Sequence, residues 1–313
     1  MSERKSVATA PSKVILFGEH AVVYGRPAIA VPLHDRQATA TVEEALPGEG
    51  ITLVVADLGR CYPLAEAPAD DPLALIVRSA LDALALPFAP DLTLAIRSTI
   101  PIASGLGSGA AVSAAAVRAL AAHFGRELTS QQVSELVYQT EVLHHGTPSG
   151  IDNTVVAFDQ PVYFMKGQPP QCFRVGQPFH LLIGDTGIPS PTKVAVADVR
   201  RGWKADRPRY ERVFEAIGQL ADEARRAIEG GDIATLGSLM DRNQALLREI
   251  GVSSPELEQL ILAAKGAGSL GAKLSGAGRG GNMIALVTQA MAEGVATDLF
   301  RVGAKDVITT CVG

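Results

Sequence analysis

The chain has 313 residues, of which 47% are hydrophobic and 19% are charged. This is the composition of a globular protein, and a chain of this length buries about three quarters of its unfolded surface, so it needs no disulfide or structural metal to fold. The formal net charge is -5 and no basic stripe is visible. A nucleic-acid partner therefore has no electrostatic support.

Local features disfavour two further classes of protein. The cysteines Cys61, Cys172 and Cys311 lie far apart and are odd in number, so we expect reduced core residues and neither a disulfide framework nor a zinc site. No secretory signal is visible at the start. The longest uncharged stretch, residues 98–117, contains Pro101 and several glycines and serines, so we expect no membrane span. These features predict a cytoplasmic protein with no membrane partner.

In chain order, the first half is predicted to contain short strands followed by helices. Apolar runs and alternating patterns predict strands over residues 14–17, 28–31, 37–43, 51–55 and 92–96. Acidic residues and a proline predict the start of a helix over residues 73–84, and an alanine-rich stretch predicts a second helix over 108–124. Thr129 is the predicted N-cap of a third helix.

The second half is predicted to contain longer helices between short strands. The helical patterns cover residues 192–203, 207–229, 233–250, 255–265 and 290–300. The strand patterns cover residues 162–164, 181–184, 272–274, 283–287 and 305–309. Runs of strands with segregated helices predict an α+β fold and not a doubly wound parallel sheet. We place a boundary near residue 178, between an N-terminal domain (1–178) and a C-terminal domain (179–313).

Four segments combine glycine with polar residues: PSKVILFGEHAVVYG (11–25), PIASGLGSGAA (101–111), GTPSGIDN (146–153) and KLSGAGRGG (273–281). In the second segment, glycines let the backbone approach a ligand, and the N-terminus of the following helix favours a phosphate. The chain has no Gly-Lys pair, so this is not a Walker A loop. Gly105, Gly107 and Ala110 match a dinucleotide fingerprint, but residues 98–101 separate it from the preceding strand. About 20 residues further on, Glu127 is followed by a helix and does not close a second strand. A phosphate-binding loop and a glycine-rich helix start without a ligand both remain open.

Two carboxylates have both a functional and a structural interpretation. Glu141 falls on the apolar stripe of its predicted helix. It is either a buried carboxylate with a partner such as Mg²⁺ or a partly exposed residue near the helix end. Ser149 and Asp152 match the capping-box pattern. Asp152 therefore either helps to start a helix or is a catalytic base held at the start of one.

The same ambiguity holds near the N-terminus. Lys13 precedes an apolar run and is either a solvated strand end or a cation that stabilises transferring phosphate charge. Glu19 and His20 lie between two glycines. They either bind a small polar substrate or are exposed turn residues. The adjacent His144 and His145 point in different directions on a helix, so we expect no shared metal there.

These four segments, together with DTGIPSPTKVAVADVR (185–200), resemble in the same order the motifs of the GHMP small-molecule kinases. Within that family, EVLHHGTPSGIDN (141–153) is most similar to the members that phosphorylate mevalonate. The similarity extends from about Lys13 to Leu286. The resemblance implies a ribosomal-S5-like N-terminal domain and a ferredoxin-like C-terminal domain. It also implies ATP- and Mg²⁺-dependent phosphorylation of the mevalonate 5-hydroxyl, without a covalent phospho-enzyme.

The resemblance also implies roles for individual residues. Asp152 would take the proton of the 5-hydroxyl, and Lys13 would lower the pKa of that hydroxyl and support the transition state. Glu141 and Ser108 would hold Mg²⁺. The ATP phosphates would lie on Pro101, Ala103, Ser104, Gly105, Leu106, Gly107, Ser108, Gly109 and Ala110. The mevalonate side would be formed by Glu19, His20, Thr192, Gly276 and Gly278.

Three positions depart from the family pattern. Ser12 replaces the usual glycine of Pro-Gly-Lys, which we expect to be tolerated. The family loop usually reads GLGSSAA, and its second serine is the usual Mg²⁺ ligand. Gly109 takes that place here, so Ser108 or water would substitute. Arg279 stands in a tract that is often all glycine, where it either donates near a phosphate or faces solvent.

Two alternative functions remain at this point. One is a GHMP kinase for another alcohol or a phosphorylated substrate such as phosphomevalonate. The other is a ligand sensor that has lost phosphotransfer, which the presence of Lys13 and Asp152 disfavours. The composition permits a homodimer without showing one.

Overall fold

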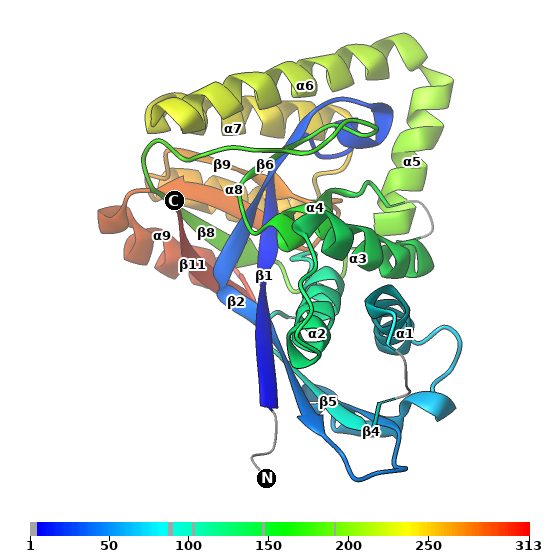
Figure 1. Cartoon of the computed structure of the whole chain (residues 1–313). Helices are drawn as coiled ribbons and strands as arrows, with labels where there is room; N and C mark the ends of the chain where they lie inside the picture. The colour runs from blue at the N-terminus through cyan, green and yellow to red at the C-terminus, as the bar shows by residue number, and fades with distance from the viewer. Residues whose placement is uncertain (1–4, 87–89, 102–103, 146–147, 191) are drawn as a thin grey trace. The chain divides into compact units, whose positions relative to one another are not determined.

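The computed structural model describes residues 5–86, 90–101, 104–145, 148–190 and 192–313. The chain folds into two compact units, each built from separate segments. The first unit comprises Met1–Ser12, Arg36–Ile102 and Gly107–Asp159, and the second comprises Lys13–Asp35, Ala103–Leu106 and Gln160–Gly313. Two long strands, β1 (Lys5–Phe17) and β2 (Ala28–Glu44), contribute residues to both units (Figure 1). The predicted boundary near residue 178 stays a prediction.

The first unit contains a sheet in the order β4-β3-β5-β2. Its other strands are β3 (Ile51–Val55), β4 (Arg60–Pro63) and β5 (Leu92–Ser98). β3 runs parallel to β5, whereas the pairs β2–β5 and β3–β4 are antiparallel. Every second residue of β5 is buried, as the alternating pattern predicts, and these residues are Leu92, Leu94 and Ile96.

Within the described part of the first unit, the helices are α1 (Pro72–Leu84), α2 (Ser108–His123), α3 (Ser130–His145) and α4 (Ile151–Phe158). α2 contacts the other three, because its buried face is mostly alanine and lets neighbouring helices approach closely. The predicted starts of α1 and α3 are confirmed. The Asp71 side chain accepts from Ala74 N, and Thr129 Oγ1 accepts from Gln132 N at 3.2 Å.

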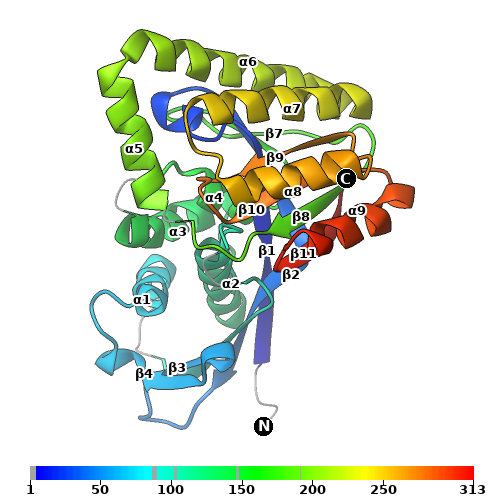
Figure 2. The same cartoon turned by 180° about the vertical axis from the view of Figure 1, so that it is seen from behind.

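The second unit contains an antiparallel sheet in the order β11-β8-β10-β9. Its strands are β8 (Phe179–Asp185), β9 (Gly271–Ser275), β10 (Asn282–Val287) and β11 (Asp306–Val312). The helices α8 (Pro255–Gly266) and α9 (Gln289–Arg301) pack on one face of this sheet (Figure 2). The apolar residues of the middle strand β10 are all buried, which makes β10 the centre of the core of this unit.

Three further helices of the second unit are α5 (Thr192–Ala205), α6 (Arg207–Gly230) and α7 (Ile233–Glu249). α6 and α7 lie side by side as a hairpin. Asp206 and Asp232 cap their N-termini by accepting from Arg209 N and Thr235 N. The unit is completed by the 3₁₀ turn η1 (Ala21–Tyr24) and the short strands β6 (Val162–Phe164) and β7 (Gln171–Cys172).

Several structural expectations need correction. The strands predicted over residues 28–31 and 37–43 form the single strand β2, β1 already begins at Lys5, and β4 and β7 were not predicted. Cys61, Cys172 and Cys311 are exposed, so the prediction of core cysteines is wrong. All three lie on short or outer strands, where alternation turns their side chains outward. Among the described residues, no helix is both long and apolar enough to cross a membrane.

Candidate active site

The glycine-rich loop before α2 has the backbone geometry of an anion site. Gly105 and Gly107 have φ values of +80° and +76°, a region that glycine adopts without strain. Gly107 is the N-cap of α2, and no side chain caps that helix. The N–H groups of the first turn, which begins at Ser108, therefore have no side-chain acceptor from the cap position. This end of α2 fits a phosphate group.

Two backbone carbonyls of the loop are held by the rest of the second unit. Lys13 N donates to Leu106 O at 3.0 Å, and the Asn282 side chain donates to Ser104 O. Of the predicted phosphate-loop residues, Ser104, Leu106 and Ala110 are buried, Gly105 and Gly109 are exposed, and Pro101, Gly107 and Ser108 are half-buried. Ala103 lies outside the described residues. Lys13 is buried, so its interpretation as a solvated strand end is wrong.

In the first unit, the structure brings Glu141 to the start of α2. Glu141 is 6% exposed, and a Cβ added to Gly109 would lie 3.6 Å from its Oε1. The interpretation of Glu141 as a partly exposed residue is therefore wrong. Among the described residues, no cluster of three or more His, Cys, Asp and Glu side chains could hold a metal ion. One buried carboxylate beside a phosphate-binding helix end is nevertheless the donor set that Mg²⁺ uses with a nucleotide, because phosphates and water supply its other ligands.

Asp152 lies half-buried in the first turn of α4. The N-cap of this helix is Gly150, with a φ of +92° and no side-chain cap. Ser149 Oγ instead accepts from Ile151 N at 3.4 Å, so the capping-box interpretation is wrong. The next residue, Asn153, donates from Nδ2 to Ser134 Oγ at 2.9 Å and thereby fixes the helix start to α3. Asp152 thus stands at a rigid helix N-terminus, whose dipole favours its charge.

In the second unit, the segment after β1 turns sharply at Gly18. A Cβ on Gly18 would lie 2.4 Å from Ala28 Cα, and its φ is +94°, so only glycine fits. Glu19 follows and is 1% exposed, so it is not an exposed turn residue. It forms an ion pair with Lys273, which is fully buried, and accepts from Asn243 Nδ2 at 3.0 Å. Burial lowers the pKa of the Lys273 ammonium, and the charge of Glu19 opposes that shift.

His20 is also buried, at 6% exposure. Its Nε2 lies 3.0 Å from Ala277 O, and because a carbonyl only accepts, Nε2 carries the proton and Nδ1 is the acceptor. The pKa of His20 is lowered to about 4, mainly by burial; the bond to Ala277 O opposes this shift, and the nearby charge of Arg279 adds to it. At neutral pH, His20 is therefore a neutral imidazole.

The fourth glycine-bearing segment (273–281) contains the loop between β9 and β10. Gly276 and Gly278 have φ values of +89° and +75°. A Cβ on Gly278 would lie 2.1 Å from Val252 O, whereas a Cβ on Gly276 would meet no atom within 4 Å. Arg279 pairs with Asp198 of α5, an interaction that neither sequence interpretation anticipated. Thr192, the first residue of the same helix, is exposed.

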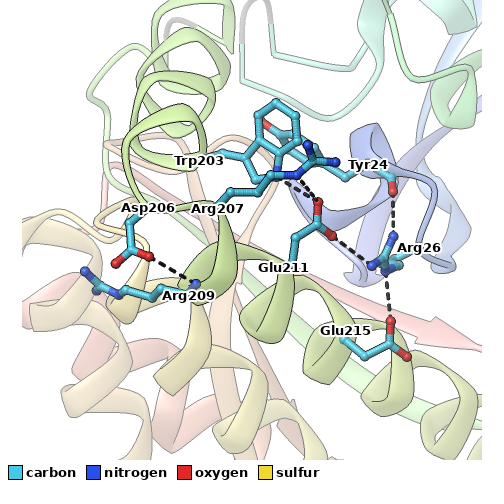
Figure 3. Close-up of polar contacts among 8 residues, drawn as sticks. All are labelled: Tyr24, Arg26, Trp203, Asp206, Arg207, Arg209, Glu211 and Glu215. Carbon is cyan, nitrogen blue, oxygen red and sulfur yellow. Dashed lines mark hydrogen bonds and ion pairs between the residues drawn. The ribbon is translucent and has the colours of Figure 1, made fainter.

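The far end of the η1 turn is anchored to α6 (Figure 3). Arg26 donates from Nη2 to Glu211 at 2.9 Å and from Nε to Glu215 at 3.0 Å. Its Nη1 donates to the carbonyl of Tyr24 at 3.0 Å. Trp203 Nε1 donates to the second oxygen of Glu211 at 2.9 Å. The segment that contains Glu19 and His20 is thus held at both ends.

The sequence analysis missed Lys273, Asn243 and Arg26 as parts of this region. Lys273 did carry a signal, because it lies between apolar residues in a predicted strand. A charged side chain in such a strand requires a partner, and Glu19 is that partner. Asn243 and Arg26 carry no comparable signal, because Asn243 lies in a polar stretch and Arg26 lies between Gly25 and Pro27, outside the predicted strands.

Comparisons with known proteins agree with this geometry. The family model described as the GHMP kinases N terminal domain matches residues 74–160, and the one described as GHMP kinases C terminal matches residues 224–305. The chain belongs to the GHMP kinase family and is an ATP-dependent small-molecule kinase. The predicted α+β, two-domain GHMP kinase fold is confirmed.

Within this family, the chain is similar over nearly its whole length to curated mevalonate kinases. The chain is 35% identical to the mevalonate kinase of Thermococcus sibiricus, over 97% of this chain and 95% of that protein. It is also 35% identical to the mevalonate kinase of Pyrococcus furiosus, over 97% of this chain and 96% of that protein. The solved structure of L. major mevalonate kinase in complex with R-mevalonate is similar, with a TM-score of 0.85, 27% identity and coverage of 100% and 96% of the two chains.

Proposed function

We propose that this kinase transfers the γ-phosphoryl group of ATP to the 5-hydroxyl of (R)-mevalonate, giving 5-phosphomevalonate and ADP. The observation that supports this substrate is the similarity to mevalonate kinases over nearly the whole chain, including one solved with R-mevalonate. The buried turn with Glu19 and His20 supports it further, because a small polar substrate needs polar groups held in fixed positions.

Asp152 is the proposed base. In the transfer, the 5-hydroxyl proton moves to the Asp152 carboxylate while the hydroxyl oxygen forms a bond to the γ-phosphorus. The bond from that phosphorus to the β-phosphate bridge oxygen breaks, and ADP leaves. The ammonium of Lys13 stabilises the negative charge of the reacting oxygens. Positioning and electrostatics supply the rate enhancement, and no phospho-enzyme forms.

The proposed ATP and metal ligands lie around the start of α2. The N–H groups of its first turn bind phosphate oxygens, together with the described loop residues Pro101 and Ser104–Ala110. Glu141 and Ser108 hold Mg²⁺, which neutralises phosphate charge when it is bound. Gly109 leaves room beside Glu141 Oε1 for a ligand or a water molecule.

The proposed mevalonate side is lined by His20, Thr192, Gly276 and Gly278, and Glu19 precedes His20 in the turn that carries it. His20 uses its unprotonated Nδ1 to accept a hydrogen bond from a substrate hydroxyl, because Nε2 already donates to Ala277 O. The open space beside Gly276 lets a ligand approach the backbone. The predicted homodimer and the cytoplasmic location stay predictions.

The test is ADP release from the purified protein with Mg·ATP and, in separate reactions, mevalonate, phosphomevalonate, galactose, homoserine or no acceptor. We expect ADP release with mevalonate and with none of the other acceptors, and phosphorus NMR of the product should show a phosphate monoester on C5. Release with phosphomevalonate or galactose and none with mevalonate would overturn the proposed substrate. ATP binding without release on any acceptor would favour the sensor function instead.

A further inference from the structure

The Glu19 carboxylate has partners for both of its oxygens inside the second unit. Oε1 pairs with the Lys273 ammonium, and Oε2 accepts from Asn243 Nδ2 at 3.0 Å. Lys273 also donates to the carbonyl of Leu274 at 2.6 Å. The side chains of Glu19 and Lys273 are both 0% exposed. Both oxygens of this carboxylate already have partners in the protein, and the carboxylate is buried. It is therefore poorly placed to bind a substrate from solution.

The strand that carries Lys273 holds the same N-terminal segment at two further points. Ser275 Oγ donates to Ile15 O at 2.9 Å and accepts from Ile15 N at 3.2 Å. Ala277 O accepts from His20 Nε2 at 3.0 Å. These contacts come from residues at alternate positions, counted from Lys273. The chain from Lys273 to Ala277 is therefore a row of attachment points for residues 15–20.

His20 adopts a backbone conformation that needs such support. Its φ is +60° and its ψ is -45°, which lies outside the regions that non-glycine residues favour. Conformations of this kind persist only where the surroundings over-determine them. Here the ion pair of Glu19 with Lys273 holds the chain immediately before His20, and the Ala277 carbonyl holds its side chain.

We propose that Lys273 is a positioning residue: by pairing with Glu19 it fixes the turn at Gly18–His20, so that the His20 imidazole meets the substrate. In this arrangement, the pair of Glu19 with Lys273 holds the turn in place, and Glu19 does not touch mevalonate itself. The substrate part of this inference rests on the proposed function. The pairing and its effect on the turn do not.

Three variants separate this role from a direct substrate contact: Glu19→Gln, Lys273→Met and the double variant. Each single variant leaves one buried charge without its partner, which loosens the turn. The double variant has no unpaired buried charge, and we therefore expect it to fold. We expect kcat/KM for mevalonate to fall on the order of 10- to 100-fold in both single variants, because a misplaced group costs this much. The fall should come mainly from KM, and the double variant should be no worse than either single one.

A substrate-free measurement accompanies the kinetics. Hydrogen–deuterium exchange of the amides of residues 18–24 should become faster in all three variants, with little change at α9. Lys273→Arg keeps the charge and should recover part of the lost activity. Lys265→Met is the matched control, because Lys265 forms an exposed pair with Asp241 at 2.5 Å, and it should leave both measurements unchanged.

Two results would overturn the proposal. The first is a Glu19→Gln variant whose KM rises tenfold more than that of Lys273→Met, since Glu19 would then bind mevalonate itself. The second is wild-type KM and wild-type exchange in Lys273→Met, since Lys273 would then have no positioning role. If the wild-type protein does not phosphorylate mevalonate, the proposed function fails, and the exchange data alone test the pairing.

Discussion

Asp152 is one of two aspartates on α4 or at its end, which makes its role testable by comparison. It lies half-buried in the first turn, whereas Asp159 is the exposed C-cap with a φ of +54°. Asp152→Asn removes the proton acceptor, so kcat should fall at least about 100-fold, the lower range for loss of a general base. Affinity for ATP, measured by calorimetry, should change little.

Asp159→Asn is the control for that variant, because asparagine also tolerates the left-handed backbone at this C-cap. Its kcat should equal that of the wild type. An Asp152→Asn enzyme that keeps more than a tenth of the wild-type kcat would show that another group takes the proton.

Gly109 offers a second test at the level of one residue. A Cβ at this position would be in ordinary contact with Glu141 Oε1, at 3.6 Å, so a serine fits. Gly109→Ser should lower the Mg²⁺ concentration for half-maximal activity, because the hydroxyl adds a ligand beside the carboxylate. It should also stabilise α2 by about 0.5 kcal/mol, since glycine is a poor helix residue.

Gly109→Ala separates these two effects, because it gives the helix gain without the hydroxyl. Activity is measured against free Mg²⁺, and stability by urea unfolding. If the alanine and serine variants have the same Mg²⁺ dependence, the serine hydroxyl does not reach the metal.

At the level of elements, two of the four glycines in the loop between β9 and β10, Gly276 and Gly278, both have a positive φ but differ in their surroundings. Gly278 is enclosed, with Val252 O where a Cβ would lie, and Gly276 is open. Gly276→Ala should cost only the backbone strain, about 1–2 kcal/mol. Gly278→Ala should cost clearly more, because the loop must also move away from Val252.

Urea unfolding of the two alanine variants checks this difference. Equal losses of unfolding free energy would mean that the loop relaxes without cost. We expect Gly276→Ala to reduce activity more than its effect on stability suggests, since its open side is the proposed place of substrate approach.

Most elements were predictable because periodicity is local information. The helices α1, α2 and α5–α9 and the strands β3, β6 and β10 lie within a few residues of their predicted bounds. β4 and β7 were missed because they are short outer strands with few apolar residues. The start of α4 was misjudged. The capping-box pattern suggested Ser149 as the N-cap, but Gly150, with its positive φ, takes that position.

The candidate site was predictable only in part. Motif order and glycine spacing indicated the phosphate loop and Asp152 through local sequence. The pair of Glu19 with Lys273 joins positions 254 apart, and the contact of His20 with Ala277 joins positions 257 apart. No periodic pattern in the sequence predicts such contacts, because each of them depends on the tertiary fold.

For the molecule as a whole, His20 links stability to pH. Burial is the main cause that lowers its pKa to about 4 from the ordinary value of 6.5. Between these values the unfolded chain binds more protons than the folded one, so stability is full above pH 6.5 and falls as pH decreases toward 4. From pH 7 to pH 5 this one group should cost about 2 kcal/mol of unfolding free energy.

Thermal unfolding of His20→Gln at several pH values measures this contribution. The variant should lose less stability than the wild type between pH 7 and pH 5, whatever its stability at pH 7. His34→Gln serves as the control, because His34 is exposed. If His20→Gln and the wild type lose the same amount, the imidazole is not held neutral by burial.

The segmented second unit has a consequence for how the protein is made. Its first residues, Lys13–Asp35, are translated early, but Lys273 and Ser275 follow more than 250 residues later. At about 5–20 residues per second, the nascent chain carries an unpaired Glu19 for roughly 10–50 seconds. We therefore expect the growing chain to depend on chaperones over that interval, and a gene divided near residue 178 to yield no second unit unless both fragments are present together.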